Sequence, residues 1–329
     1  MTRTDATYVL RSLRATAREA IWYVGCRHEQ GDRPNILLFA TRRGGSTWAM
    51  ELIGANRGVR PLNQPFATLS RNVTYAQMLE IPRFHEGQIT SIDPSTGPRL
   101  ERLVRRVLDG EIIINGPTKF WSRDFVRVSD RLVLKITDAK PVIDWFDTTF
   151  DVDIVLLTRH PIPQALSCIR NGWTLTVDSH LRDPGFVAAN LDGAAEAAAH
   201  DVMNGDDELQ KFVLNWGLEN LAPLRLLPDR PDWLHVRYEA CVAKPQEVLE
   251  RMASRLGLTD RAEMAAVVDR PSGSSHLATA DTVAAIRSGN AEAALERWRS
   301  DIDADAERRA LQLLERLGID VTPILAPAD

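Results

Sequence analysis

The sequence predicts an α/β fold, and two stretches carry this prediction. Residues 35–56 begin with a short apolar run of strand length, 36–39, which is followed by a glycine-containing turn and then by apolar residues at helical spacing. A second apolar run, 154–157, ends just before Pro161, and proline suits the first turn of a helix. Strand, turn and helix in this order, occurring twice, are typical of an α/β domain.

Composition narrows the classes of partner. The chain has 329 residues, a length that fits one large domain. Its 40 Lys and Arg residues against 45 Asp and Glu residues give a formal net charge of -5, which argues against a general nucleic-acid-binding surface. Any basic site must therefore be local, and we expect its ligand to be a small anion.

The cysteines and the N-terminal residues indicate a cytoplasmic protein. Cys26, Cys168 and Cys241 are far apart and fit neither a disulfide framework nor a zinc cluster, so we expect ordinary thiols in a reducing compartment. No run approaches the roughly 18 apolar residues that span a bilayer. The first residues carry charges where a signal peptide would have its apolar core.

Several further elements follow along the chain. Residues 6–26 have one apolar stripe among arginines and predict a docked peripheral helix, which we prefer to membrane attachment. The turn-rich stretch 57–93 is expected to supply loops over a pocket. Helical spacing returns at 100–108, and residues 132–136 predict a strand that gives way to a helix near 142–146.

The first turn has the chemistry of an anion site. It reads Thr41-Arg42-Arg43-Gly44-Gly45-Ser46-Thr47. A glycine loop before a helix presents consecutive backbone N–H groups to one point, and arginines add bidentate positive charge. The alternative is a tight turn without a ligand, because short glycine motifs are weak evidence.

The second strand end supplies another candidate pair. Arg159 follows the strand, and Ser167 lies about two turns into the next helix. The two side chains can converge on one phosphate, the arginine as a forked donor and the serine as a hydroxyl donor. The alternative is that Arg159 belongs to a structural ion pair.

Together these residues resemble the sulfotransferases that use 3′-phosphoadenosine 5′-phosphosulfate (PAPS), in particular their bacterial branch. The matching pieces are Arg43-Gly44-Gly45-Ser46-Thr47-Trp48, then Arg159-His160-Pro161 with Ser167, then His235-Val236-Arg237-Tyr238-Glu239 with Pro245 and Leu256-Gly257-Leu258, and finally Trp298-Arg299 with a helix at 307–317. They occur in the family's order over about residues 34–318.

The resemblance implies a fold and an activity. It implies a three-layer α/β architecture with a central parallel sheet, P-loop-NTPase-like in its sulfotransferase form, as one domain over 1–329. The acidic, alanine-rich segment 174–207 is unmatched and could be a lid or an acceptor-binding insertion. The implied activity moves a sulfuryl group from PAPS to a hydroxyl or amine of a small-molecule, lipid or carbohydrate acceptor, releases 3′-phosphoadenosine 5′-phosphate (PAP) and needs no metal. A homodimer is left open.

The resemblance also assigns residues to roles. The expected cofactor-binding residues are Arg42, Arg43, Gly44, Gly45, Ser46, Thr47, Trp48, Arg159, Ser167, Tyr238 and Arg287. The first loop would hold the 5′-phosphosulfate, Arg159 and Ser167 the 3′-phosphate, and Trp48 and Tyr238 the adenine. The expected catalytic residues are Arg43, Lys135 and Asp138. Core packing is the alternative for Trp48.

Two departures from the family affect these roles. Cytosolic members have a catalytic histidine after the strand lysine, whereas Lys135 is followed by Thr137 and Asp138. Asp138 is therefore the first candidate for the general base, and His85 and Glu86 are its rivals. The Arg-Lys-Gly triplet that binds the 3′-phosphate is absent, and Arg287 with the following Ser-Gly would substitute for it.

Two other classes remain as alternatives. A relative that binds PAP or PAPS without catalysis would also explain the missing histidine. A P-loop nucleotide kinase would share the strand, loop and helix, but its motif has a lysine before the Ser/Thr, and Gly45 occupies that place before Ser46.

Overall fold

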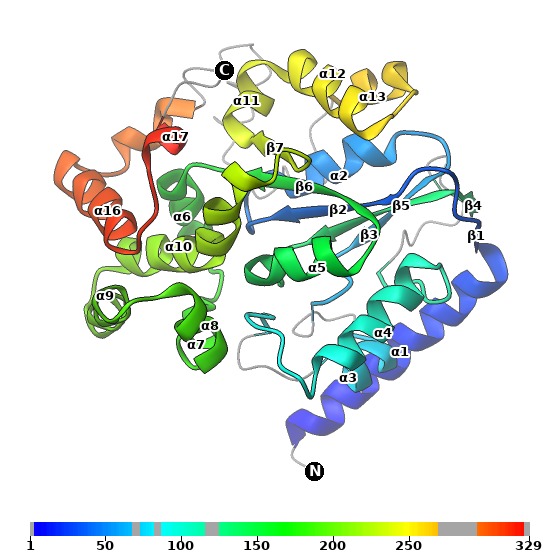
Figure 1. Cartoon of the computed structure of the whole chain (residues 1–329), viewed down its shortest axis with the longest axis horizontal. Helices are drawn as coiled ribbons and strands as arrows, with labels where there is room; N and C mark the ends of the chain where they lie inside the picture. The colour runs from blue at the N-terminus through cyan, green and yellow to red at the C-terminus, as the bar shows by residue number, and fades with distance from the viewer. Residues whose placement is uncertain (1–2, 68–72, 82–86, 116–124, 269–294, 326–329) are drawn as a thin grey trace.

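The structure is a computed structural model that describes residues 3–67, 73–81, 87–115, 125–268 and 295–325 (Figure 1). Its centre is a sheet of five parallel strands in the order β3-β5-β2-β6-β7. These strands are β3 (Val59–Asn63), β5 (Arg131–Ile136), β2 (Asn35–Ala40), β6 (Val152–Thr158) and β7 (Leu234–Arg237). The predicted α/β fold with a central parallel sheet is confirmed.

The sheet is buried on both faces, as parallel sheets are. Alternate residues of β2 point to opposite sides, so Leu37 and Phe39 join one core cluster while Ile36 and Leu38 join another. The first cluster is covered by α4 (Gly97–Leu108), α5 (Ile143–Thr149) and Trp22 of α1 (Arg3–Gly25), with α3 (Tyr75–Glu80) beside them. The second is covered by α2 (Ser46–Gly54), α11 (Tyr238–Ala243), α12 (Pro245–Leu256) and α13 (Arg261–Val268). Three layers result.

A helical region extends the domain beyond β6 (Figure 1). It is built on α6 (Pro161–Arg170), α10 (Glu208–Leu226) and α16 (Ala304–Arg316), which share a third core cluster around Trp216. Segment 174–207 folds as α7 (Val177–Leu181), α8 (Pro184–Asn190) and α9 (Gly193–Asn204). Its Phe186, Ala195 and Ala199 are buried in the same cluster.

The remaining elements are short. They are β1 (Arg27–His28), which pairs with β4 (Val128–Ser129), the 3-10 turns η1 (Lys140–Val142), η2 (Leu227–Asp229) and η4 (Arg297–Ser300), and the helix α17 (Thr322–Leu325). Among the residues that the structure describes, no helix is long and apolar enough to cross a bilayer. Cys26, Cys168 and Cys241 are free thiols.

Strand β3 lies inside the turn-rich stretch 57–93, which the sequence predicted to supply loops over a pocket. Pro61 stands in its middle and argues against a strand in the interior of a sheet. β3 is the edge strand, however, so it pairs with β5 on one side and its proline is tolerated. The stretch therefore holds a strand at 59–63 and a helix at 75–80, neither of which the sequence singled out.

Candidate anion-binding site at the strand ends

The turn at residues 41–45 joins β2 to α2 at the carboxyl edge of the sheet. The backbone N–H of Gly44 donates to the Thr41 carbonyl oxygen at 3.0 Å, and Gly45 has a left-handed φ of 89°. A Cβ at Gly45 would lie 2.6 Å from Cδ2 of Tyr238, and one at Gly44 would lie 2.8 Å from the Thr41 oxygen. Both glycines are therefore needed for this loop to form.

Arg43 is held in an uncommon backbone conformation by two other segments. Its φ is 63°, a region that non-glycine residues rarely occupy. Nη1 of Arg159 donates to its carbonyl oxygen at 2.7 Å, and its own Nε donates to Oγ of Ser167 at 3.1 Å. The structure thus brings together three residues that the sequence predicted to share a site.

Tyr238 completes this cluster. It begins α11 directly after β7, and the Arg159 guanidinium carbon lies 4.4 Å from the centre of its ring, a cation–π contact. Nε of Arg159 is buried and meets no hydrogen-bond acceptor among the described residues. A buried N–H group of this kind is costly unless a partner is supplied, so the site is chemically suited to an added anion.

The positive charges of Arg43 and Arg159 also favour the binding of an anion in this cluster. Burial lowers the pKa of Arg43, and the positive charges of Arg159 and Arg170 lower it further. Two guanidinium groups, those of Arg43 and Arg159, are thus held close to the N-terminus of α2, where backbone N–H groups also attract negative charge.

The motifs of the resemblance meet in space around His160. The backbone N–H of His160 donates to Oε1 of Glu239 at 2.9 Å, and its ring centre lies 4.9 Å from that of Trp298. Burial and nearby arginines lower the pKa of His160 to about 3, so its imidazole is neutral. It is a packed structural residue beside the site.

Lys135 reaches the loop from the neighbouring strand β5. It pairs with Leu38 of β2 in the sheet, and its Nζ lies 3.4 Å from Oγ1 of Thr47 in the first turn of α2. Burial lowers its pKa to about 8, and the negative charges of Asp138 and Glu51 partly oppose that shift. Lys135 is therefore a largely desolvated cation next to the loop.

Asp138 lies just beyond the end of β5 and is buried. Oγ1 of Thr137 donates to its Oδ2 at 3.0 Å. Burial raises the pKa of Asp138, while the charge of Arg42, the hydrogen bond from Thr137 and the charge of Lys135 act against the rise. A carboxyl group with a raised pKa is a better proton acceptor than a solvated aspartate.

Two of the expected cofactor-binding side chains make contacts outside the cluster of Arg43, Arg159, Ser167 and Tyr238. Nη1 of Arg42 donates to the Thr174 carbonyl oxygen at 3.3 Å, and its guanidinium carbon lies 5.8 Å from the Trp173 ring. Trp48 is half-buried, and its covered side packs against the core cluster under α2. His85, Glu86 and Arg287 lie outside the described residues.

A buried polar network beneath the loop was missed from the sequence. Nζ of Lys140 donates to Oγ1 of Thr41 at 3.0 Å and also to the side-chain oxygen of Asn220 on α10. Nδ2 of Asn220 is 3.3 Å from the same threonine oxygen. Burial lowers the pKa of Lys140 to about 7. A sequence signal for this network is the set of polar residues Asn215, Glu219 and Asn220 among the apolar residues of α10.

The next turn of α10 holds the start of segment 174–207. Oδ1 of Asn215 accepts from the backbone N–H of Thr176 at 2.5 Å, and Oε1 of Glu219 accepts from the Thr176 hydroxyl at 3.1 Å. All three residues are buried. One stretch of α10, residues 215–220, therefore supports both the glycine loop and this segment.

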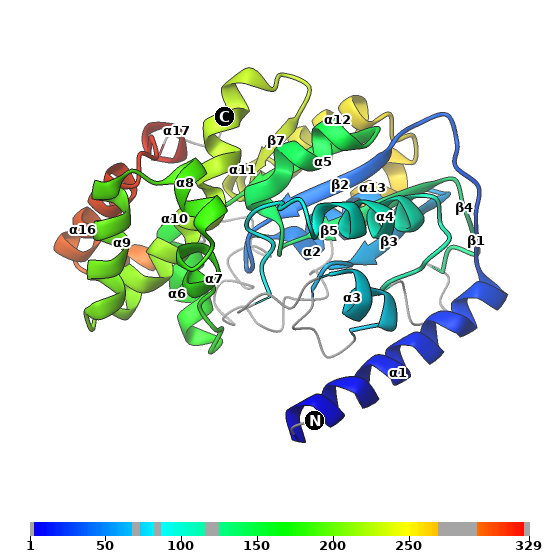
Figure 2. The same cartoon turned by 60° about the horizontal axis from the view of Figure 1, so that its bottom comes forward.

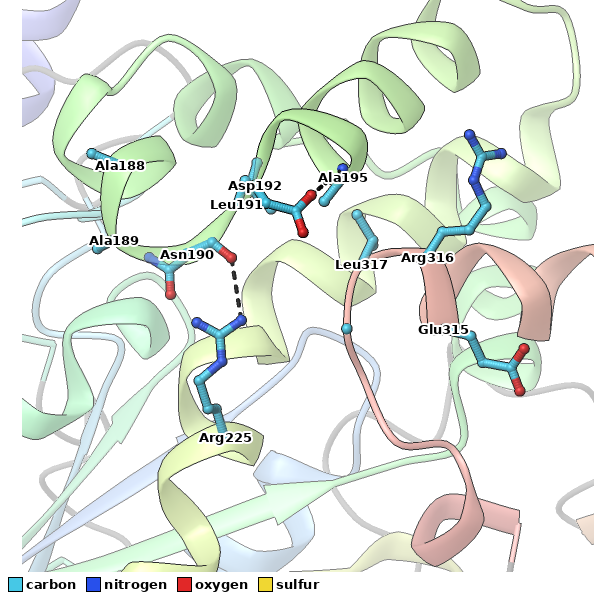
Figure 3. Close-up of a pocket in the computed structure, with 11 residues that line it drawn as sticks. Ala188, Ala189, Asn190, Leu191, Asp192, Ala195, Arg225, Glu315, Arg316 and Leu317 are labelled. Carbon is cyan, nitrogen blue, oxygen red and sulfur yellow. Dashed lines mark hydrogen bonds between the residues drawn. The ribbon is translucent and has the colours of Figure 1, made fainter.

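A separate cavity of about 430 Å³ lies between α8, α9, α10 and α16 (Figure 3). Nη2 of Arg225 donates to the Asn190 carbonyl oxygen at 3.2 Å across its wall, and Oδ1 of Asp192 accepts from the Ala195 N–H at 2.8 Å. The cavity shares no lining residue with the cluster around Arg43. Within the described part of the chain, no group of three or more His, Cys, Asp or Glu side chains could hold a metal ion.

Comparison with known proteins gives distant likenesses only. No family model and no curated protein matches this chain. The sulfotransferase domain of the Synechococcus PCC 7002 olefin synthase is 16% identical with a TM-score of 0.41, over 89% of this chain and 99% of that one. Mouse sulfotransferase SULT7A1, complexed with PAP, is 14% identical with a TM-score of 0.38, over 91% and 86%. A sulfotransferase from Alicyclobacillus acidocaldarius is 15% identical with a TM-score of 0.38, over 85% and 100%. Identities and TM-scores this low assign no activity.

Proposed function

We propose that this chain transfers a sulfuryl group from PAPS to a hydroxyl or amine acceptor and releases PAP. The observation that carries the proposal is the meeting of Arg43, Arg159 and Ser167 at one end of the glycine loop, with Lys135 beside the helix that follows it. The cations lie at two places along the carboxyl ends of the strands, Arg43 and Arg159 at one and Lys135 at the other. This arrangement suits a ligand with two separate anionic groups.

The residues fit such a donor. The two glycines let the loop turn tightly against Tyr238 and the Thr41 carbonyl oxygen, and we assign the N–H groups of Gly45, Ser46 and Thr47 to the 5′-phosphate. The 3′-phosphate is assigned to Arg159, whose Nε is buried without an acceptor among the described residues, and to Ser167. Tyr238 would meet the adenine edge, with Trp48 as the stacking partner and Arg42 and Arg287 as further cations.

Bound PAPS would supply a sulfuryl group on a phosphate leaving group, and the cations of this chain would act on the charge that develops. Arg43 is a fixed positive charge that does not donate its proton easily, so its role is electrostatic. Lys135, with a pKa of about 8, keeps its proton at pH 7 and acts from a buried position where screening by water is weak.

The acceptor must lose a proton, and we assign that proton to Asp138. Its raised pKa suits a general base, and its place two residues past the end of β5 puts it near Lys135. His85 and Glu86 are the rivals for this role. Segment 174–207 is proposed to contact the acceptor, and the enzyme is proposed to act in the cytoplasm.

The test is turnover by the full chain with sulfur-labelled PAPS and separate acceptors: a phenol, an aliphatic alcohol, an amine, a glycolipid and an oligosaccharide. We expect label in at least one product and tight binding of PAP by calorimetry. Binding of PAP with no transfer to any acceptor would favour the inactive relative. Binding of ATP with magnesium, and phosphate transfer in place of sulfate transfer, would favour the nucleotide kinase.

A further inference from the structure

Helix α1 packs on the domain through one narrow stripe. Ser12, Ala15, Glu19 and Trp22 are buried, and Trp22 belongs to the core cluster beneath α4 and α5. At about 100° per residue, these four positions fall within an arc of about 80°. The helix is therefore docked at the periphery, as the sequence predicts, and Figure 2 shows it along the outer edge of the molecule next to α3.

The opposite face of α1 is apolar and exposed. It consists of Leu10, Leu13, Ala17, Ile21 and Val24. Leu10 is 58% exposed, Ile21 is 57% exposed and Val24 is 92% exposed. These positions also span an arc of about 80°, and its centre lies opposite that of the buried stripe. A surface helix of a globular protein usually turns its polar face outward, so this arrangement is reversed.

A row of arginines borders this apolar stripe. Arg14, Arg18 and Arg11 follow one another around the helix from the edge of the stripe toward the buried side. Glu19 is the one acidic residue between 7 and 25, and it lies on the buried side, where burial raises its pKa to about 8. The outward face of α1 is thus apolar with Arg14 at its border, and Arg18 and Arg11 lie on the flank between that face and the buried stripe.

Although the sequence alone favoured a docked helix over membrane attachment, the exposed apolar face reverses that preference, and we propose that α1 docks the protein onto an anionic lipid surface. The stripe of Leu10, Leu13, Ala17, Ile21 and Val24 would enter the boundary between headgroups and acyl chains, and the arginine row would contact lipid phosphates. Amphipathic helices that lie in the membrane plane combine these features, a continuous apolar face and flanking Lys or Arg. Basic residues near an anionic membrane add electrostatic attraction that salt weakens.

A second copy of the chain fits this face less well. Two α1 helices that pack antiparallel about a two-fold axis place like flanks together, so the arginine rows would face each other. Between residues 7 and 25 the one acidic side chain is Glu19, which is buried, so α1 offers no exposed carboxylate to Arg11 and Arg14 of another copy. Anionic lipid supplies both the apolar volume and the negative charge that this face lacks.

The experiment is co-sedimentation of the full chain with vesicles of phosphatidylcholine alone or mixed equally with phosphatidylglycerol. We expect binding to the mixed vesicles only, weakened by salt. The double variants Leu10→Ser/Ile21→Ser and Arg11→Glu/Arg14→Glu should each lower the partition coefficient by about tenfold or more. Unchanged thermal unfolding would show that both variants are folded, since neither alters a buried side chain.

Two control variants separate this face from general surface effects. Val128→Ser removes an exposed apolar side chain outside α1, and Arg316→Glu changes an exposed charge on α16, so both should bind as the wild type does. Absence of wild-type binding to mixed vesicles, or equal binding to both vesicle types, would overturn the proposal. A different result would also overturn it: the wild type is a dimer by light scattering, the Leu10→Ser/Ile21→Ser variant is a monomer, and the wild type does not bind vesicles.

Discussion

Arg159 has two tasks in the proposed site. Its Nη1 braces the Arg43 carbonyl oxygen, while its buried Nε is left for a ligand. Arg159→Ala should weaken PAP binding by about 2–4 kcal/mol, the scale for removing one partner of a hydrogen-bonded charge pair. Adenosine 5′-phosphate, which lacks the 3′-phosphate, should lose little. Calorimetry with both ligands measures the difference, and Arg159→Lys should fall between because it keeps the charge without the fork. Equal losses for both ligands would leave Arg159 with the bracing task alone.

Lys135 should affect the chemical step more than binding. Lys135→Ala is expected to lower kcat by about 10²–10³, the usual effect of losing one electrostatic contact to the transition state, with a small change in PAP affinity. Arg43→Ala should behave in the same way. Lys244→Ala, at an exposed lysine, is the matched control. Weakened donor affinity with full kcat would make these cations plain phosphate anchors.

The same lysine predicts a pH dependence. Its folded-state pKa is about 8, so its positive charge is present below that pH and is lost as the pH rises through it. We expect kcat to fall above about pH 8 in the wild type and to fall less in Lys135→Arg, whose guanidinium keeps its proton. Profiles of the same shape for both proteins would assign the fall to another group.

Asp138 is tested by the acidity of the acceptor. As the general base, Asp138 should matter more for aliphatic alcohols than for phenols, whose protons leave readily. Asp138→Asn should therefore reduce the rate for the alcohol more strongly than for the phenol. Unchanged rates for every acceptor would remove Asp138 from the mechanism and direct attention to His85 and Glu86.

The glycine loop between β2 and α2 depends on its backbone shape. Gly45→Ala would place a Cβ 2.6 Å from Tyr238 and hold alanine at a φ of 89°, so donor affinity should fall at least about tenfold. Gly54→Ala in the same helix is the matched control, because its nearest neighbour, Pro61, would be at an ordinary 3.5 Å. Calorimetry with PAP compares the two variants. Similar affinities would mean that the loop does not shape the donor site.

How well an element could be predicted depended on how local its signal is. The runs that became β2, β5 and β6 are short and mostly apolar, with Lys135 as the charged residue inside the run of β5, and each strand is buried along most of its length. β3 was missed because Arg60 and Pro61 interrupt it, and both are tolerated only through contacts outside the strand. Arg60 is buried with its Nη2 bonded to the carbonyl oxygens of Arg27 and Arg127, and Pro61 lies in an edge strand.

In the candidate site, too, the residues with a local sequence signal could be predicted and those without one could not. Arg43, Arg159, Ser167 and Tyr238 could be predicted because each belongs to a motif with its own spacing, and the structure brings them into contact. The supporting residues could not. Lys140 and Asn220 are 80 positions apart, and nothing near either one indicates that both bond to Thr41 or to each other. Such contacts depend on how α10 packs on the sheet.

Lys140 links the sheet to the helical region, and its burial should be visible in the stability of the whole molecule. Its pKa is about 7 when folded, against 10.5 for an exposed lysine. The unfolded chain therefore binds more protons between those pH values, and stability rises with pH. From pH 7 to pH 9 the wild type should gain roughly 2 kcal/mol relative to Lys140→Met. Urea unfolding at both pH values measures this gain. Lys244→Met should show none, and parallel profiles for Lys140→Met would contradict the assignment.

The two ends of segment 174–207 are both fixed on α10. Thr176 is bonded to Asn215 and Glu219, and Asp207 caps the first turn of the helix by accepting from the Gln210 N–H at 3.1 Å. Residues 207 and 215 are about 12 Å apart along the helix axis, so the chain leaves and returns over a short distance. The residues between these anchors should therefore be replaceable as a unit. We expect a replacement segment to fold if it keeps both anchors, an aromatic side chain at position 186 and small side chains at positions 195 and 199, which are buried in the third core cluster. Acceptor preference could then be re-engineered while the strand ends, and with them donor recognition, stay unchanged.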